Sequence, residues 1–193
     1  MKSFLFLIFA AISLTCNAQM ATPSAPSFYW SNKDFSKEVA LFRAKSFVVA
    51  NILGTSTKTV KFEMDPLAAA SSGELTSLVY KSSELNKEGL ILGFFGPKWS
   101  PDGVFYQGYG FKDLPTVKAI ELLNKIEKVI SDNTKYLNAE TSTNNVTFTY
   151  DDLTFIISFD IATNIRVFWN DFDASWDGTA FKRTKKRLLK KLD

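Results

Sequence analysis

The stretch VTFTYDDLTFIISF, residues 146–159, decides the fold class of this 193-residue chain. Apolar and polar residues alternate on both sides of Asp151 and Asp152, which is the period of a strand with one face in water. Two short acidic residues between such runs favour a tight turn, so the stretch predicts a β-hairpin. A third alternating run, residues 165–169, extends the hairpin to a three-strand antiparallel meander.

Outside the meander, the sequence predicts four further strands and three helices. The expected elements are a helix over 31–54, strands over 60–64, 75–80, 90–95 and 104–111, a helix over 115–130, and a C-terminal helix over 178–192. The run 90–95 has no polar face, so we expect it to be covered on both sides. This order is not a βαβ alternation. It predicts an α+β fold, a mainly antiparallel sheet of about seven strands with helices packed on it.

The apolar periodicity of the first two helices predicts which side of each is buried. For the first helix, the expected buried residues are Phe35, Val39, Phe42, Val49 and Leu53. For the second helix, they are Val117, Ile120, Leu123, Ile126 and Ile130. Gly54 and Asn133 are expected to end these helices in the left-handed conformation.

The N-terminus has the pattern of a secretory signal. Lys2 precedes an apolar run over 4–14, and the small residue Ala18 precedes the expected cleavage point, an ending that resembles bacterial export signals. We predict a signal peptide (1–18), a flexible leader (19–27) and a single α+β domain (28–193) in the periplasm or outside the cell. Alternatively, Cys16 is acylated as in a lipoprotein. The apolar run is too short to cross a bilayer, so we expect no transmembrane anchor.

Composition restricts the chemistry of the exported product. The chain contains no histidine, and its one cysteine, Cys16, lies in the predicted signal. A Ser-His-Asp triad, a thiolate nucleophile and an ordinary zinc site are therefore excluded after cleavage. We expect no cofactor and no metal.

The C-terminal helix is the most unusual feature of the exported chain. Its polar side carries Lys182, Arg183, Lys186, Arg187, Lys190 and Lys191, opposite an apolar stripe formed by Phe181, Leu188 and Leu192. With Lys185, the tail holds seven of the 22 basic residues after residue 18, whereas residues 19–181 hold 15 basic and 19 acidic groups. This segregation predicts contact with an anionic envelope polymer, a membrane surface or a protein partner, with nucleic acid less favoured. The alternative is a solvated face whose cations complement the helix dipole.

An oxygen-rich run precedes this helix and has two interpretations. Asp173, Ser175 and Asp177 alternate as in the first half of a calcium loop, with Asp171 just before them, but Thr184 occupies the position of the bidentate Glu. The same side chains are good helix N-caps. The sequence therefore leaves open whether Asp171, Asp173 and Asp177 bind calcium or cap the helix.

Two other groups of residues suggest carbohydrate contact. Trp99, next to a predicted turn, offers a flat face for stacking on a sugar ring. Candidates for the carboxylate pair of a glycoside hydrolase are Asp151, Asp152, Asp160, Asp171 and Asp173. The preferred hypothesis is a non-catalytic secreted or cell-envelope binding module. The alternatives are a carboxylate-dependent carbohydrate-active enzyme and a purely structural envelope protein.

Overall fold

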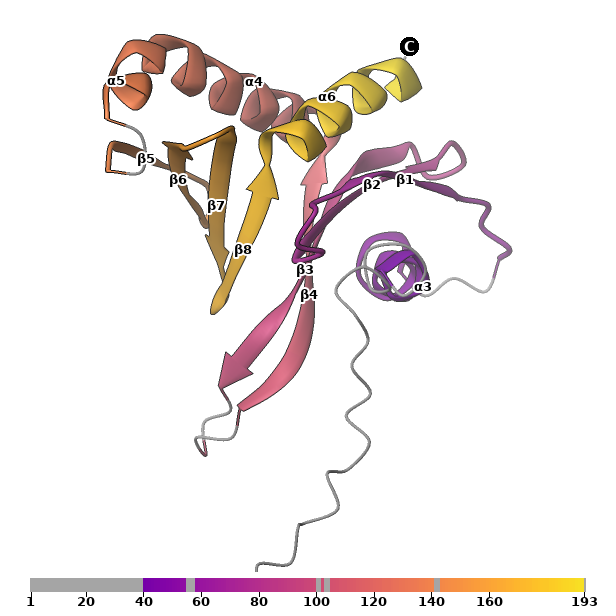
Figure 1. Cartoon of the computed structure of the whole chain (residues 1–193). Helices are drawn as coiled ribbons and strands as arrows, with labels where there is room; N and C mark the ends of the chain where they lie inside the picture. Colours follow the sequence, from indigo (N-terminus) through magenta and orange to yellow (C-terminus); the bar gives the residue numbers. More distant parts are fainter. Residues whose placement is uncertain (1–39, 55–57, 100–101, 103–104, 141–142, 193) are drawn as a thin grey trace, which may run out of the picture.

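The computed structural model describes residues 40–54, 58–99, 102, 105–140 and 143–192, and confirms the α+β class. These residues form eight strands in two four-stranded antiparallel sheets, with four α-helices and one π-helical segment (Figure 1). The elements are α3 (Ala40–Phe47), η2 (Val48–Leu53), β1 (Glu63–Ala69), β2 (Leu75–Ser82), β3 (Lys87–Trp99), β4 (Phe105–Pro115), α4 (Thr116–Asp132), α5 (Thr134–Ala139), β5 (Asn145–Tyr150), β6 (Leu153–Phe159), β7 (Thr163–Trp169), β8 (Phe172–Asp177) and α6 (Gly178–Leu192). The predicted signal peptide and leader lie outside the described residues.

Both sheets are simple meanders. Their strand orders are β1-β2-β3-β4 and β5-β6-β7-β8, so each strand pairs with its neighbours in sequence. The strands β3 and β4 pair without a register shift from Gly89 opposite Pro115 to Trp99 opposite Phe105. Their distal half extends beyond the sheet as an arm that points away from α4 and α6 (Figure 1). The single seven-stranded sheet predicted from sequence is therefore wrong, because the C-terminal meander forms its own sheet and gains β8.

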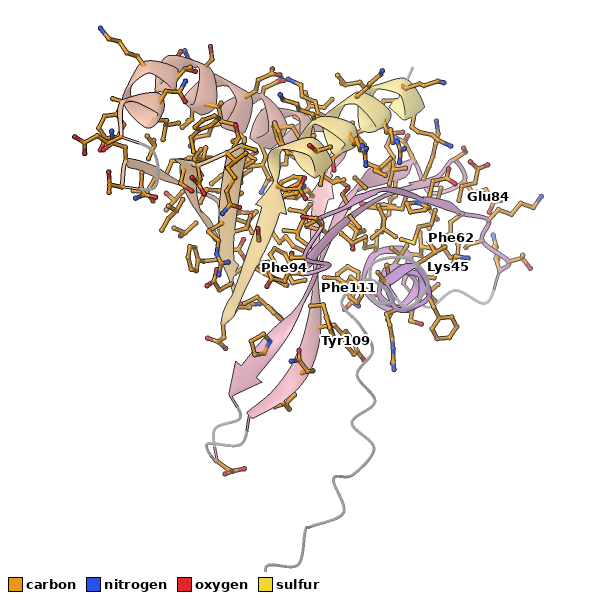
Figure 2. All side chains as sticks on the ribbon, in the orientation of Figure 1. Lys45, Phe62, Glu84, Phe94, Tyr109 and Phe111 are labelled. Carbon is orange, nitrogen blue, oxygen red and sulfur yellow. The ribbon has the colours of Figure 1, made fainter. Side chains whose placement is uncertain are left out.

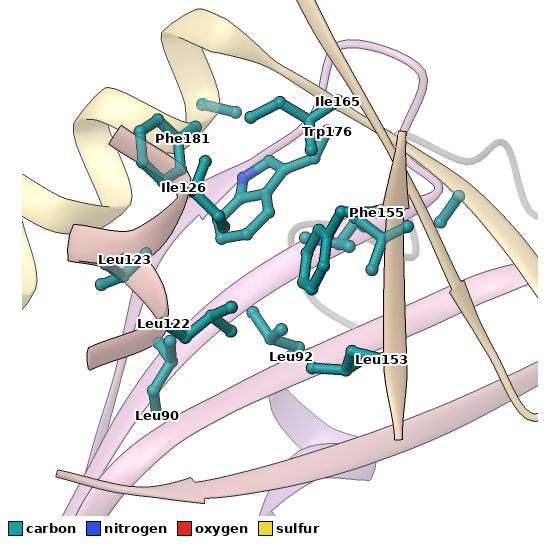
Figure 3. Packing of buried hydrophobic residues seen from close by; sticks show 14 of the residues in the cluster. Leu90, Leu92, Leu122, Leu123, Ile126, Leu153, Phe155, Ile165, Trp176 and Phe181 are labelled. Atoms are coloured by element: carbon teal, nitrogen blue, oxygen red, sulfur yellow. The ribbon is translucent and has the colours of Figure 1, made fainter. Parts of the chain in front are cut away.

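The main core lies between the two sheets and beneath α4 and α6. Leu90 and Leu92 of β3 meet Phe155 of β6 and Trp176 of β8 in one buried cluster, which the inner faces of both helices close (Figure 3). Burial of this much apolar surface is the principal source of stability in a chain without disulfides. The two sheets share one core.

A second core lies on the opposite face of the first sheet, against α3. Ile91 and Phe95 of β3 pack with Ala44 and Val48, and Phe111 lies beside the helix (Figure 2). The run 90–95 is thus buried on both faces, as its lack of polar residues predicted. Leu90 and Leu92 contact the main core, whereas Ile91 between them contacts the second core. This alternation is the period of a strand.

The predicted buried face of the first helix is wrong at two of the three residues that the structure describes. Phe42 is 69% exposed and Val49 48% exposed, whereas Leu53 is half-buried and packs against the second core. The residues against the sheet are Ala40, Ala44 and Val48. Small side chains let α3 approach the curved sheet closely, so the contact face is not the one with the largest apolar residues. Phe35 and Val39 lie outside the described residues.

The second helix keeps most of its predicted stripe. Leu123 and Ile126 are buried, and Ile120 and Ile130 are half-buried, with Ile130 packed against the main core. Val117 is 68% exposed, however, and Ala119 and Leu122 are buried in addition. The buried face is rotated because α4 packs on β3 and β4 while it also covers the other sheet. Asn133 has φ −110° and is followed by α5, so the predicted left-handed end is also wrong.

The strand β8 was missed because its acidic residues were interpreted as a loop. Its burial alternates, with Phe172, Ala174 and Trp176 inside, which is strand periodicity. The preceding turn has Asn170 at φ 44° and Asp171 at φ 64°, as a type I′ hairpin requires. Gly110 of β4 makes room for this hairpin, because a Cβ there would lie 2.8 Å from the Phe172 ring.

Candidate functional site

The helix α6 begins at a well-formed N-cap. Asp177 Oδ1 accepts a hydrogen bond from the Ala180 N–H at 2.9 Å, and Oδ2 accepts one from the Ser71 N–H at 2.8 Å. Burial alone would raise the pKa of Asp177, but these backbone hydrogen bonds outweigh it and hold the pKa below its ordinary value. The capping interpretation of Asp177 is therefore confirmed. The same carboxylate joins the start of α6 to the β1–β2 turn.

Replacement of Asp177 by alanine is expected to lower the free energy of unfolding by about 1–2 kcal/mol at pH 7. Because the folded-state pKa is lowered, this contribution is present above the ordinary carboxyl pKa and disappears as the pH falls through the folded value. Urea unfolding of the wild type and of Asp177→Ala at pH 7 and pH 2.5 checks this. The difference should shrink at pH 2.5. A constant difference across this range would contradict the assignment.

The apolar face of α6 is fixed to both sheets. Phe181 and Leu188 are buried, and the Phe181 ring packs edge-on against Trp176 with centroids 5.4 Å apart. Thr184, also fully buried, lies 2.6 Å from the Ser77 hydroxyl of β2. The stripe of Phe181 and Leu188 predicted from sequence is thus confirmed. The opposite side of the helix is forced toward solvent.

Three cations of α6 contact the body of the protein. Lys185 pairs with Glu127 of α4 at 2.6 Å, Lys191 pairs with Asp65 of β1 at 2.6 Å, and Arg187 donates to the Leu67 carbonyl. Exposed ion pairs contribute little stability, so their main effect is to orient the helix across β1. Of the six predicted binding residues, Arg187 and Lys191 are therefore engaged within the protein.

The other four predicted residues remain without a partner in the described part of the chain. Lys182, Arg183, Lys186 and Lys190 are exposed, and no ion pair or hydrogen bond involves their side chains there. Lys182, Lys186 and Lys190 follow one another at intervals of four residues, a rise of about 6 Å each, so they form one row along the helix. We call these four residues the cation row. Leu189, 41% exposed, lies beside it.

The two carboxylates at the β5–β6 turn form ion pairs with a lysine of β4. Asp152 lies 2.5 Å and Asp151 3.3 Å from Lys112 of β4, and the Trp169 indole donates to Asp152 at 2.9 Å. Burial by itself would lower the pKa of Lys112 and raise that of Asp152. For Lys112 the hydrogen bonds and charges of Asp152 and Asp151 together outweigh burial and raise the pKa, and for Asp152 the hydrogen bonds from Lys112 and Trp169 and the charge of Lys112 together lower it. Both groups are thus held in their charged forms as an ion pair between the sheets.

The remaining candidate acids point elsewhere. Asp173, on the outer face of β8, forms a two-point ion pair with Arg166 of β7. Asp160 and Asp171 lie in turns at opposite ends of the second sheet. Asp173 is therefore engaged in an ion pair, and Asp160 lies at the end of the sheet opposite to Asp171.

The calcium interpretation also lacks its geometry. Asp173 and Asp177 lie on an extended strand, where alternate residues are about 7 Å apart, so their oxygens do not converge on one ion. Within the described residues, no three acidic, histidine or cysteine side chains gather closely enough to hold a metal.

Sequence reasoning missed one half-buried acid. Asp113 of β4 lies next to Tyr80 on the side of the first sheet that faces α3, and its buried Oδ1 has no hydrogen-bond partner among the described residues. Burial raises the pKa of Asp113, and interactions with Tyr80 and Lys112 only partly offset this effect. The sequence signal is an acid two residues after Phe111, on the same face of the strand. The pair keeps two polar groups associated inside the second core.

A small pocket near the C-terminal end of α6 is too small to serve as a ligand site. It is lined in part by Glu63, Tyr80, Glu88 and Lys191 and encloses about 40 Å³. That volume holds a few water molecules, whereas small-molecule sites usually occupy several hundred Å³.

The sugar-stacking prediction for Trp99 falls on a side chain outside the described part of the structure. Its backbone ends β3, in the arm, opposite Phe105. Tyr106 and Tyr109 of the arm are exposed, and the Arg43 guanidinium of α3 lies 5.0 Å from the Tyr109 ring centre. Trp99 as a ligand-stacking residue therefore stays a prediction.

Comparisons with protein-family models, with curated proteins and with solved structures gave no match for this chain. Among the described helices, none combines the length and apolar character of a membrane span. The candidate site is therefore the cationic side of α6.

Proposed function

We propose that this protein is a non-catalytic extracytoplasmic binding module that contacts an anionic partner through the cation row of α6. One observation carries the proposal: Lys182, Arg183, Lys186 and Lys190 are exposed and have no partner among the described residues, on a helix whose other face is buried. The extracytoplasmic location rests on the predicted signal peptide. The proposed role needs no cofactor.

The distribution of charge supports an oriented contact. Residues 19–181 carry four more acidic than basic groups, while the end of the chain is strongly basic. A polyanion is therefore attracted to α6 and repelled by much of the remaining surface. Each basic group near an anionic surface adds on the order of 1 kcal/mol, and this contribution decreases as salt rises.

Reversal of two charges tests the proposal. The variant Lys186→Glu, Lys190→Glu is expected to bind heparin, inorganic polyphosphate or anionic vesicles about tenfold or more weakly than the wild type at 50 mM salt. Titrations at 50 and 200 mM salt should give a steep salt dependence for the wild type and a shallower one for the variant.

The matched control is Lys45→Glu, Lys135→Glu, which changes net charge equally at exposed lysines of α3 and α5. It should retain most of the binding. Equal loss in both double variants would mean that net charge alone matters. Negligible binding of every probe by the wild type would reject the proposal in favour of a solvated helix face.

A further inference from the structure

We infer that the anionic partner is a lipid surface, which the outward side of the α4–α6 layer meets with the cation row and Leu189. This inference rests on the proposed function and narrows it to one class of partner. Its basis is that cations without a partner in the described structure and an exposed leucine lie on the same side of one helix.

The helices α4 and α6 lie on the same side of the molecule. Both bury their inner faces in the main core, and both lie above the two sheets (Figure 1). The Lys185–Glu127 ion pair joins them. Their outward faces therefore point in one direction, and a planar surface can approach the whole cation row at once.

Leu189 supplies the apolar component of the contact. It follows Lys185 and Lys186 by about one turn and precedes Lys190, so it lies at the edge of the row toward α4. An exposed leucine between lysines suits a headgroup layer, where the cations meet phosphate and the leucine enters the acyl boundary.

The contact must be shallow. An interfacial helix usually inserts its whole apolar face, but here Phe181 and Leu188 are committed to the core. Within α6, Leu189 is the exposed large apolar residue that can enter the membrane while the fold stays intact. Binding should therefore be reversible, dependent on anionic lipid and sensitive to salt.

A soluble linear polyanion would satisfy the cation row but would leave Leu189 in water. The environment of residue 189 therefore distinguishes a lipid surface from a soluble polyanion. Because Cys16 is the only cysteine of the chain, a protein that starts at residue 19 and carries Leu189→Cys has a single thiol. This truncation removes no described element, and an environment-sensitive fluorophore on that thiol reports apolar contact directly.

The labelled protein is titrated with vesicles of phosphatidylglycerol and phosphatidylcholine, with pure phosphatidylcholine vesicles and with inorganic polyphosphate. We expect a blue shift with the anionic vesicles alone, and its loss when Lys186→Glu and Lys190→Glu are added. The control label at Tyr106→Cys lies on the arm that points away from α4 and α6 (Figure 1), so its emission should not change.

A label-free measurement accompanies the titration. In vesicle sedimentation, Leu189→Ala should lower the partition coefficient about twofold to threefold without changing its salt dependence. Binding to polyphosphate should be unaffected by Leu189→Ala.

The outcomes separate the two proposals. Lysine-dependent binding of polyphosphate with no shift at position 189 on anionic vesicles would overturn the lipid inference and leave the proposed function standing. Failure to bind either probe would overturn both. A shift at Tyr106→Cys instead of Leu189→Cys would place the membrane contact on the arm and overturn the inference.

Discussion

Replacement of Trp176 by alanine is expected to lower the free energy of unfolding by about 3–5 kcal/mol, the range for removing a large buried aromatic side chain. Trp176 is 1% exposed and lies where the second sheet, β3 and α6 meet (Figure 3). Its ring packs against Phe181, so its removal opens a cavity beneath the helix that carries the cation row. The core cannot close this cavity without moving one sheet toward the other.

Urea unfolding followed by far-ultraviolet circular dichroism measures the effect, and Ile161→Ala is the control. Ile161 is 93% exposed in the β6–β7 turn, so its truncation should change stability by no more than about 0.5 kcal/mol. A loss below about 1 kcal/mol for Trp176→Ala would show that the two sheets do not share the packed core described here.

Substitution of Gly89 by alanine is expected to cost about 2–3 kcal/mol. A Cβ at this position would lie 2.5 Å from the Leu114 carbonyl oxygen and 2.9 Å from the Tyr80 hydroxyl. The first of these atoms belongs to the backbone of β4, so the β3–β4 ladder itself would have to shift. Gly89 is therefore a point at which Tyr80 and β4 approach β3 too closely for a side chain.

The same strand provides a control for this prediction. A Cβ at Gly96 would meet nothing within 4 Å, so Gly96→Ala should be close to neutral or slightly stabilising through the unfolded chain. Differential scanning calorimetry of both variants makes the comparison. Equal melting temperatures for Gly89→Ala and Gly96→Ala would mean that the close approach at Gly89 is not present in solution.

Local patterns predicted the elements whose environment is simple. The meander over 146–169 and α6 each have one buried face and one wet face, so their periodicity is visible in the sequence. The helix α3 lacks this simplicity, because Ala40 and Ala44 make its contact while Phe42 is exposed. A pattern of large apolar residues cannot predict a buried face that consists of small side chains.

Long-range pairing explains the rest of the differences. The split into two sheets depends on how β8 lies against β3, and the Ser71–Asp177 hydrogen bond joins residues 106 positions apart. Likewise, the sequence predicted the cationic side of α6 but not which of its cations pair with other described residues. Lys191 is paired with Asp65, which lies 126 residues earlier, so no local sequence pattern predicts this contact.

The most direct test of the central claim is amide chemical-shift mapping of the ¹⁵N-labelled protein from residue 19, titrated with inorganic polyphosphate at low salt. We predict that the largest shifts occur in α6 around Lys182, Arg183, Lys186 and Lys190, while Tyr106 and Tyr109 of the arm do not change. Shifts concentrated on the arm or on the outer face of the second sheet, with α6 unaffected, would contradict the assignment of the binding site to α6.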